Sequence, residues 1–174
     1  MKARILDLLL VASVFWGGAP SPVMAVVLTP TTLEELTTSA DGVFLGRVIQ
    51  KESVLDPERK LIFTKYTFSI ERTISGAPAS TVVLTELGGE VGDLGMGVPG
   101  SPEYELGEEA VVFYRAGKQR LMTLRWSEGK FRIVEGGDGS REVVQPSVGV
   151  RMPLEAFATR VARILAAGGK EERK

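Results

Sequence analysis

The chain has 174 residues, a length typical of one domain, and it combines 44% apolar with 25% charged residues, the balance of a folded globular protein. Its formal net charge is −1, so it lacks the basic excess with which proteins hold a nucleic-acid backbone. It contains neither His nor Cys, which excludes imidazole-based nucleophilic catalysis and the ligands of nearly all zinc, copper and haem sites. We therefore expect no metal, no cofactor and no nucleic-acid partner.

Residues 1–25 have the pattern of a secretory signal peptide. Lys2 and Arg4 give a positive start, an apolar segment follows, and small residues at 23–25 form a cleavage site. An uncleaved anchor is the alternative, but glycines and a proline at 17–20 interrupt the apolar run before it reaches the roughly 20 residues that a membrane span needs. We expect cleavage at this site, export to the periplasm or the extracellular space, and no stable membrane anchor afterwards.

The mature chain is interpreted as one domain over 26–168, followed by a solvated tail at 169–174. Near its start, residues 31–36 predict a short helix. Thr31 or Thr32 can act as the N-cap, and two glutamates follow in the first turn, where the helix dipole favours negative charge.

The next segments predict an antiparallel sheet. A first strand is expected at 43–50, and Gly46 within it indicates a bulge or a tight bend. After a polar connection at 51–60, residues 62–71 alternate between an apolar face and a mostly polar one, and 81–87 alternate in the same way. Strands with one solvent-exposed face are typical of antiparallel sheets.

The remaining strands follow a long loop. Residues 110–115 form a strongly apolar run, which predicts a strand with neighbours on both edges. We expect 121–126 and 130–134 to form a hairpin. A glycine-rich loop at 136–140 then precedes a short extended piece at 143–144.

Residues 153–167 predict an amphipathic helix, because apolar side chains recur at steps of three and four. Pro153 suits the first helical position, and Gly168 is expected to end the helix. Its arginines suggest a membrane-surface helix as the alternative. Glu155 and the short length favour packing against the sheet instead.

The loop at 88–107 contains seven glycines and two prolines, and a loop of this length is usually functional or disordered. Residues 95–100 match the G-x-G-x-x-G pattern of dinucleotide-binding proteins. Pro99 and Pro102 exclude the helix that this motif requires, so we interpret the match as accidental.

Four carboxylates close to this loop suggest an acid–base pair such as glycosidases use: Glu103, Glu105, Glu108 and Glu109. A glycosidase cleft is lined by aromatic side chains, and the mature chain has one tryptophan, Trp126. A solvated acidic rim is the favoured interpretation, and a carboxylate-based hydrolase remains the least favoured function.

Three stretches together resemble the netrin module and the tissue inhibitors of metalloproteinases. They are Ala-Asp-Gly-Val-Phe-Leu-Gly-Arg-Val at 40–48, the strand from Tyr66 that leads to Ile74-Ser75-Gly76, and Leu-Gly-Glu-Glu-Ala-Val-Val-Phe at 106–113. The chain is also similar to small exported bacterial proteins of unassigned function. The resemblance spans about residues 40–134 and implies a mainly β fold: an antiparallel OB-like barrel with a short N-terminal helix and a C-terminal amphipathic helix.

The resemblance also implies one activity, metalloprotease inhibition. In that family the mature N-terminus presents its α-amine and carbonyl to the protease zinc, and here the expected N-terminal residue is Val26. A co-exported protease is the partner that this alternative implies.

Our leading hypothesis is an exported, non-enzymatic interaction module that presents the loop at 88–107 to a protein or peptide partner. We assign no catalytic residue. The candidate partner-binding residues are Gly89, Leu94, Met96, Val98, Pro99, Tyr104 and Val26.

Overall fold

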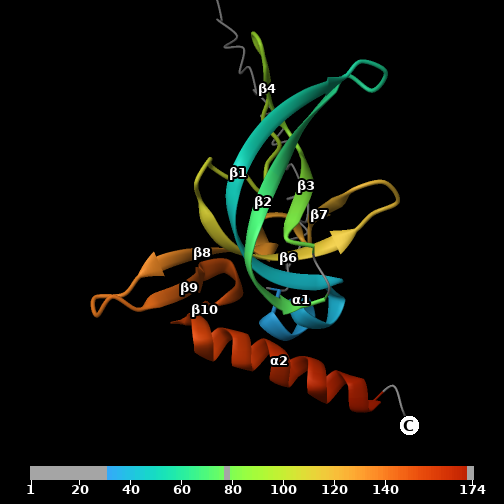
Figure 1. The fold of residues 1–174 in the computed structure, drawn as a ribbon. Coiled ribbons are helices and arrows are strands. Elements are labelled where there is room, and N and C mark those ends of the chain that lie inside the picture. Colours follow the sequence, from blue (N-terminus) through green and yellow to red (C-terminus); the bar gives the residue numbers. More distant parts are fainter. Residues whose placement is uncertain (1–30, 77–78, 172–174) are drawn as a thin grey trace, which may run out of the picture.

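The computed structural model describes residues 31–76 and 79–171, and it shows a mainly β protein with two α-helices (Figure 1). The predicted signal peptide and the candidate residue Val26 lie outside the described residues. The helices are α1 (Leu33–Ser39) and α2 (Leu154–Glu171), and two short 3-10 helices are η1 (Trp126–Gly129) and η2 (Pro146–Val148). The strands are β1 (Gly42–Asp56), β2 (Leu61–Ser75), β3 (Thr81–Leu87), β4 (Gly89–Val91), β5 (Leu94–Met96), β6 (Glu109–Ala116), β7 (Leu121–Thr123), β8 (Lys130–Glu135), β9 (Arg141–Gln145) and β10 (Val150–Pro153).

Eight strands form one sheet in the order β1-β2-β3-β7-β6-β8-β9-β10, and β1 also pairs with β6. The strands β1, β2, β3, β7 and β6 therefore each pair with two others of this group. All of these pairings are antiparallel except that of β3 with β7, which is parallel and consists of the single pair Leu84 and Leu121. A separate small sheet consists of β4 and β5.

The sheet is buried on both faces where β1 pairs with β6. Val43 and Leu45 belong to a core that includes α1 and α2, whereas Phe44 and Val48 belong to a second core enclosed by β1, β2, β3 and β6. Residues on successive positions of a strand point to opposite faces, so a strand between two cores reads as a continuous apolar run. The same explanation holds for β6, whose prediction as a strand with neighbours on both edges is confirmed.

The first two strands are longer than the sequence pattern predicted. The expected polar connection at 51–60 is strand as far as Asp56, and only the turn at 57–60 separates β1 from β2. Most side chains of β1 beyond Val48 are exposed, so they carry no alternation of apolar and polar residues. The expected irregularity at Gly46 is confirmed: the register shifts there, and a Cβ atom would lie 2.9 Å from the Ser69 carbonyl oxygen.

The predicted hairpin of 121–126 with 130–134 is wrong. β7 pairs with the C-terminal part of β6 and β8 with its N-terminal part, and β1 occupies the other edge. β7 and β8 thus follow one another along one edge of β6 instead of pairing together. The interruption between them contains Arg125 and Trp126, which both have positive φ angles, 51° and 59°.

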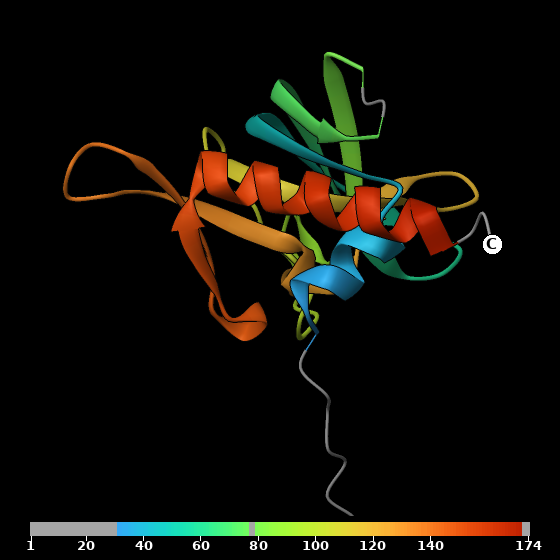
Figure 2. The same ribbon diagram turned by 90° about the horizontal axis from the view of Figure 1, so that it is seen from below.

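Two helices cover the same core, and Figure 2 shows α2 lying across the sheet with α1 beside it. α1 begins with a capping box between Thr32 and Glu35, as the N-terminal pattern predicted. α2 buries Leu154, Phe157 and Val161. The predicted end of this helix at residue 167 is wrong, because Gly168 lacks the left-handed conformation that ends a helix and α2 continues to Glu171.

Within 31–76 and 79–171, no helix has both the length and the apolar character that crossing a membrane requires.

Candidate functional site

The glycine-rich segment at 88–107 contains secondary structure, contrary to the expected irregular loop. It forms the hairpin β4–β5, with Glu90 opposite Gly95. The hairpin begins against β2, where the Thr64 hydroxyl donates a hydrogen bond of 2.7 Å to the Gly88 carbonyl. Gly89 has a φ of 129°, and a Cβ atom at this position would lie 2.1 Å from the Thr64 hydroxyl oxygen. Gly89 is therefore a packing requirement of the hairpin.

Tyr104 lies in the core and offers no surface to a partner. Its side chain is fully buried, and its ring packs edge-to-face against Tyr66 and Phe68. Its hydroxyl group lies 2.7 Å from the hydroxyl oxygen of Thr123 on β7. The sequence prediction of a partner-binding role for the Tyr104 side chain is therefore wrong. The aromatic side chain anchors its polar loop to the core instead.

The other candidate residues divide between surface and partial burial. Leu94 at the tip of the β4–β5 hairpin is 57% exposed, and Pro99 is also exposed. Met96 and Val98 are half-buried. The structure thus brings four of the candidates together on one projecting segment, beside the long β1–β2 hairpin and on the side of the sheet away from the two α-helices (Figure 1).

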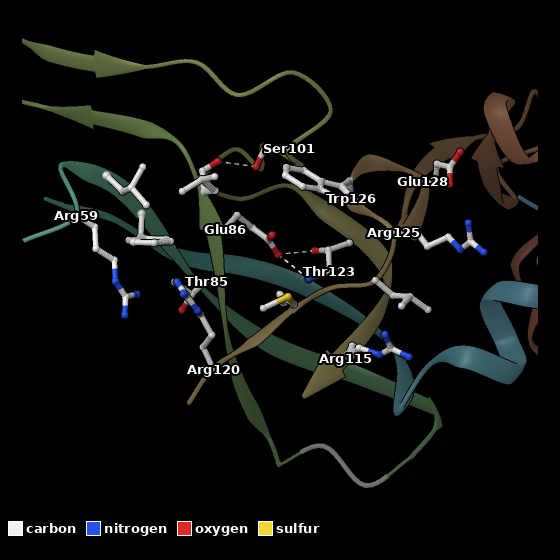
Figure 3. Close-up of a pocket in the computed structure, with 15 residues that line it drawn as sticks. Arg59, Thr85, Glu86, Ser101, Arg115, Arg120, Thr123, Arg125, Trp126 and Glu128 are labelled. Atoms are coloured by element: carbon white, nitrogen blue, oxygen red, sulfur yellow. Dashed lines mark hydrogen bonds between the residues drawn. The ribbon is translucent and has the colours of Figure 1, made fainter. Parts of the chain in front are cut away.

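A cavity that the sequence analysis did not identify lies between β2, β3, β7 and η1 (Figure 3). Its volume is about 690 Å³. The turn between β1 and β2 contributes Arg59, and the returning part of the 88–107 segment contributes Ser101. We call this cavity the arginine basin, and its lining residues are Arg59, Leu61, Phe63, Thr85, Glu86, Leu87, Ser101, Arg115, Arg120, Met122, Thr123, Leu124, Arg125, Trp126 and Glu128.

The wall nearest the glycine-rich segment is fixed by two hydrogen bonds. The Ser101 hydroxyl donates to the Leu87 carbonyl at 2.6 Å, and the Ser127 backbone N–H donates to the Gly100 carbonyl at 2.9 Å. These bonds connect the end of β3, the segment after β5 that contains Gly100 and Ser101, and η1. The arginine basin and the predicted recognition segment are therefore neighbours.

The basin carries a local positive charge in a chain whose net charge is −1. Four arginines and two glutamates line it. Arg59 and Arg125 form only long ion pairs, at 3.9 Å to Asp56 and 4.0 Å to Glu35. Over the described part of the chain, no ion pair is formed by Arg115 or Arg120.

Two aromatic side chains, Phe63 and Trp126, belong to the apolar part of the lining. The Arg120 guanidinium lies 4.3 Å from the centre of the Phe63 ring, a cation–π contact that also holds the charge beside the basin. Trp126 is 51% exposed. Its φ of 59° is unfavourable for a bulky residue, and such a conformation persists where the surrounding structure enforces it.

The most buried charged residue of the basin is Glu86, which is 6% exposed. It accepts two hydrogen bonds of 2.7 Å from Thr123, one from the backbone N–H and one from the hydroxyl. Burial raises the pKa of Glu86, whereas the Thr123 hydrogen bonds and the Arg120 charge act in the opposite direction. Glu86 also lines a second cavity of about 430 Å³, which includes Lys51 and Tyr66.

This arrangement is suited to binding a ligand that has both apolar and anionic groups. Within the described ranges, no cluster of three or more acidic residues is placed to hold a metal ion. Sequence reasoning missed the basin because its lining residues are spread between 59 and 128 and come together only through the pairing of β3 with β7.

No family model, curated protein or solved structure matches this chain in the comparisons.

Proposed function

We propose that this protein is an exported, non-enzymatic interaction module that binds a protein or peptide partner in the arginine basin. The observation that carries the proposal is the basin itself: a concave surface of about 690 Å³ lined by four arginines, the exposed Trp126 and the half-buried Phe63. Its volume lies within the range of about 300–1,000 Å³ that is usual for ligand sites. Tryptophan and arginine are also the residues that most often dominate binding energy at interfaces.

The scaffold in this proposal is an OB-like barrel of the kind found in the netrin module. The mutual pairing of β1, β2, β3, β7 and β6, with a parallel contact between β3 and β7, supports this assignment. OB-type barrels bind ligands on strands two and three and on the loops after strands one and four. The basin occupies the equivalent place, with Arg59 in the β1–β2 turn and Arg120 next to β7 in the β6–β7 turn.

The β4–β5 hairpin forms the flank of the proposed surface. Leu94 is exposed at its tip, and the segment that follows supplies Ser101 to the basin wall. A partner seated in the basin is therefore expected to extend over the hairpin. Leu94 supplies apolar area for this contact.

Site-specific photo-crosslinking tests the proposal. A benzophenone amino acid is placed at position 126 in the basin, at position 94 on the hairpin, or at position 163 on α2 as the matched exposed control. Each full-length variant is irradiated in the producing cells, and the exported fraction is analysed by mass spectrometry. We expect one defined protein or peptide to be crosslinked from position 126, also from position 94, and not from position 163. Equal crosslinking from position 163, or none from position 126, contradicts the proposal.

A further inference from the structure

We propose that the ligand of the arginine basin is an acidic peptide segment in which carboxylate side chains flank an apolar residue. This inference rests on the proposed function and specifies the chemistry of the partner. It follows from three properties of the lining: the arginines without ion-pair partners, their positions, and the apolar surface between them.

Arg115 and Arg120 provide the anion-binding groups. Neither guanidinium takes part in an ion pair among the residues that the structure describes, in contrast to Arg47, Arg72, Arg141, Arg151 and Arg160, which form ion pairs of 2.6–3.2 Å. A guanidinium binds a carboxylate through two parallel N–H···O bonds. Arg132 and Arg163 also form no ion pair in the described part of the chain, so the distinguishing property of Arg115 and Arg120 is that both line the same basin, where a carboxylate of the partner can reach them.

The arginines lie on both sides of the basin. In Figure 3, Arg59 and Arg120 lie on one side of the Glu86–Thr123 pair, and Arg115 and Arg125 lie on the other. A ligand that uses both sides needs two separated negative groups. An extended peptide provides this arrangement through acidic side chains at separate positions along its backbone.

Apart from the arginines, the two glutamates, Thr85, Ser101 and Thr123, the lining is apolar. Phe63, Met122 and Trp126 lie along it, together with Leu61, Leu87 and Leu124. These side chains favour an apolar or aromatic residue between the two acidic groups of the ligand, because burying such a residue contributes about 1.5–3 kcal/mol.

The two glutamates argue against a nucleic-acid ligand. Glu86 and Glu128 lie in the same lining as the arginines and would repel a continuous phosphate backbone. Four arginines balanced by two glutamates suit a ligand with a few carboxylates. The Glu86 carboxylate of the protein is buried below the surface of the basin, where the apolar centre of a bound peptide covers it.

The test is a titration of the full-length protein into fluorescein-labelled peptide Glu-Glu-Phe-Leu-Glu-Glu, followed by fluorescence anisotropy. The controls are Gln-Gln-Phe-Leu-Gln-Gln, which lacks the charges, and Glu-Glu-Gly-Gly-Glu-Glu, which lacks the apolar centre. We expect both controls to bind at least about tenfold more weakly, since each loses charge-assisted hydrogen bonds or buried apolar area.

Protein variants locate the binding. Arg115→Gln and Arg120→Gln are each expected to weaken binding of the acidic peptide by about tenfold, whereas Arg163→Gln on the exposed face of α2 leaves binding unchanged. Circular dichroism confirms that each variant is folded. Equal binding of the charged and uncharged peptides, equal effects of all three variants, or tighter binding of oligothymidylate overturns the inference.

The outcome also separates this inference from the proposed function. If position 126 crosslinks a partner but the acidic peptide does not bind, the ligand chemistry is wrong and the interaction role stands. If position 126 crosslinks nothing and no peptide binds, both proposals fail.

Discussion

Glu86 accepts hydrogen bonds from both the backbone N–H and the hydroxyl of Thr123, each at 2.7 Å. The parallel strands β3 and β7 pair through their backbones only at Leu84 and Leu121. Two residues further along, the Glu86 side chain supplies the acceptor that a backbone carbonyl provides in a regular sheet. A buried carboxylate thus holds these two strands together at the arginine basin, and Tyr104 extends the hydrogen-bonded chain into the core.

This arrangement predicts that stability decreases as pH rises. Burial raises the pKa of Glu86 above the usual value of 4.5. Below pH 4.5 the carboxyl group is protonated in both the folded and the unfolded chain. As pH rises through the interval between the unfolded and folded pKa values, the unfolded chain loses its proton first, so the Glu86 contribution to folding becomes less favourable.

The variant Glu86→Gln isolates this effect, because its amide oxygen still accepts from Thr123 and it carries no charge. Urea denaturation of both proteins from about pH 4 to pH 8 is expected to show the wild type losing stability relative to Glu86→Gln as pH rises. A stability difference that stays constant over this range, or that moves in the opposite direction, contradicts a raised pKa for Glu86.

Tyr104→Phe tests the role of Tyr104 as an anchor. Loss of its hydroxyl leaves Thr123 with one hydrogen bond fewer, so we expect the free energy of unfolding to fall by about 0.5–1.5 kcal/mol. Tyr114→Phe is the matched control, because over the described residues the Tyr114 hydroxyl makes no side-chain hydrogen bond. Equal losses in the two variants would show that the contact with Thr123 contributes nothing specific.

The strand patterns were the most predictable part of the fold. Residues 62–71 alternate in sequence, and Ile62, Thr64, Tyr66 and Phe68 are buried as that alternation predicts. By contrast, β7 and β8 resembled a hairpin because a short turn separates two apolar runs. Both runs pair with β6 instead, along the same edge. This choice of partner depends on residues far away in the sequence, so the local pattern does not reveal it.

The candidate site was less predictable than the fold. The glycine-rich segment was identified from composition, but composition does not show that Gly89 is required by close packing against Thr64 or that Tyr104 is buried. The arginine basin joins residues more than sixty positions apart, from Arg59 to Glu128. A surface assembled from short segments that lie far apart in the sequence leaves no single motif.

Gly46 is expected to be intolerant of a side chain. In Gly46→Ala the new methyl group would lie 2.9 Å from the Ser69 carbonyl oxygen and 3.2 Å from the Phe44 ring, so we expect a loss of about 1–3 kcal/mol in the free energy of unfolding. Gly97→Ala is the control, because its methyl group would meet no atom within 4 Å, and we expect no loss. Chemical denaturation measures both, and equal stability of the two variants would refute the close packing at Gly46.

The two faces of α2 are expected to differ sharply. Phe157 is fully buried against Phe113 and Phe131, so Phe157→Ala is expected to cost about 3–5 kcal/mol. Leu165 is 37% exposed, and Leu165→Ala is expected to cost less than about 1 kcal/mol. Thermal unfolding distinguishes the two outcomes. A small effect of Phe157→Ala would mean that α2 does not pack on the sheet.

The position of the recognition surface is tested most directly by a ¹H–¹⁵N NMR titration of the protein with the peptide Glu-Glu-Phe-Leu-Glu-Glu. We predict that the shifted signals cluster at the arginine basin: the backbone amides of Phe63, Thr85 and Thr123, and the indole N–H of Trp126. The chemical shifts of amides on the exposed face of α2 are predicted to remain unchanged. Shifts confined to α2, or to the β4–β5 hairpin without the basin, would contradict the assignment of this surface as the binding site.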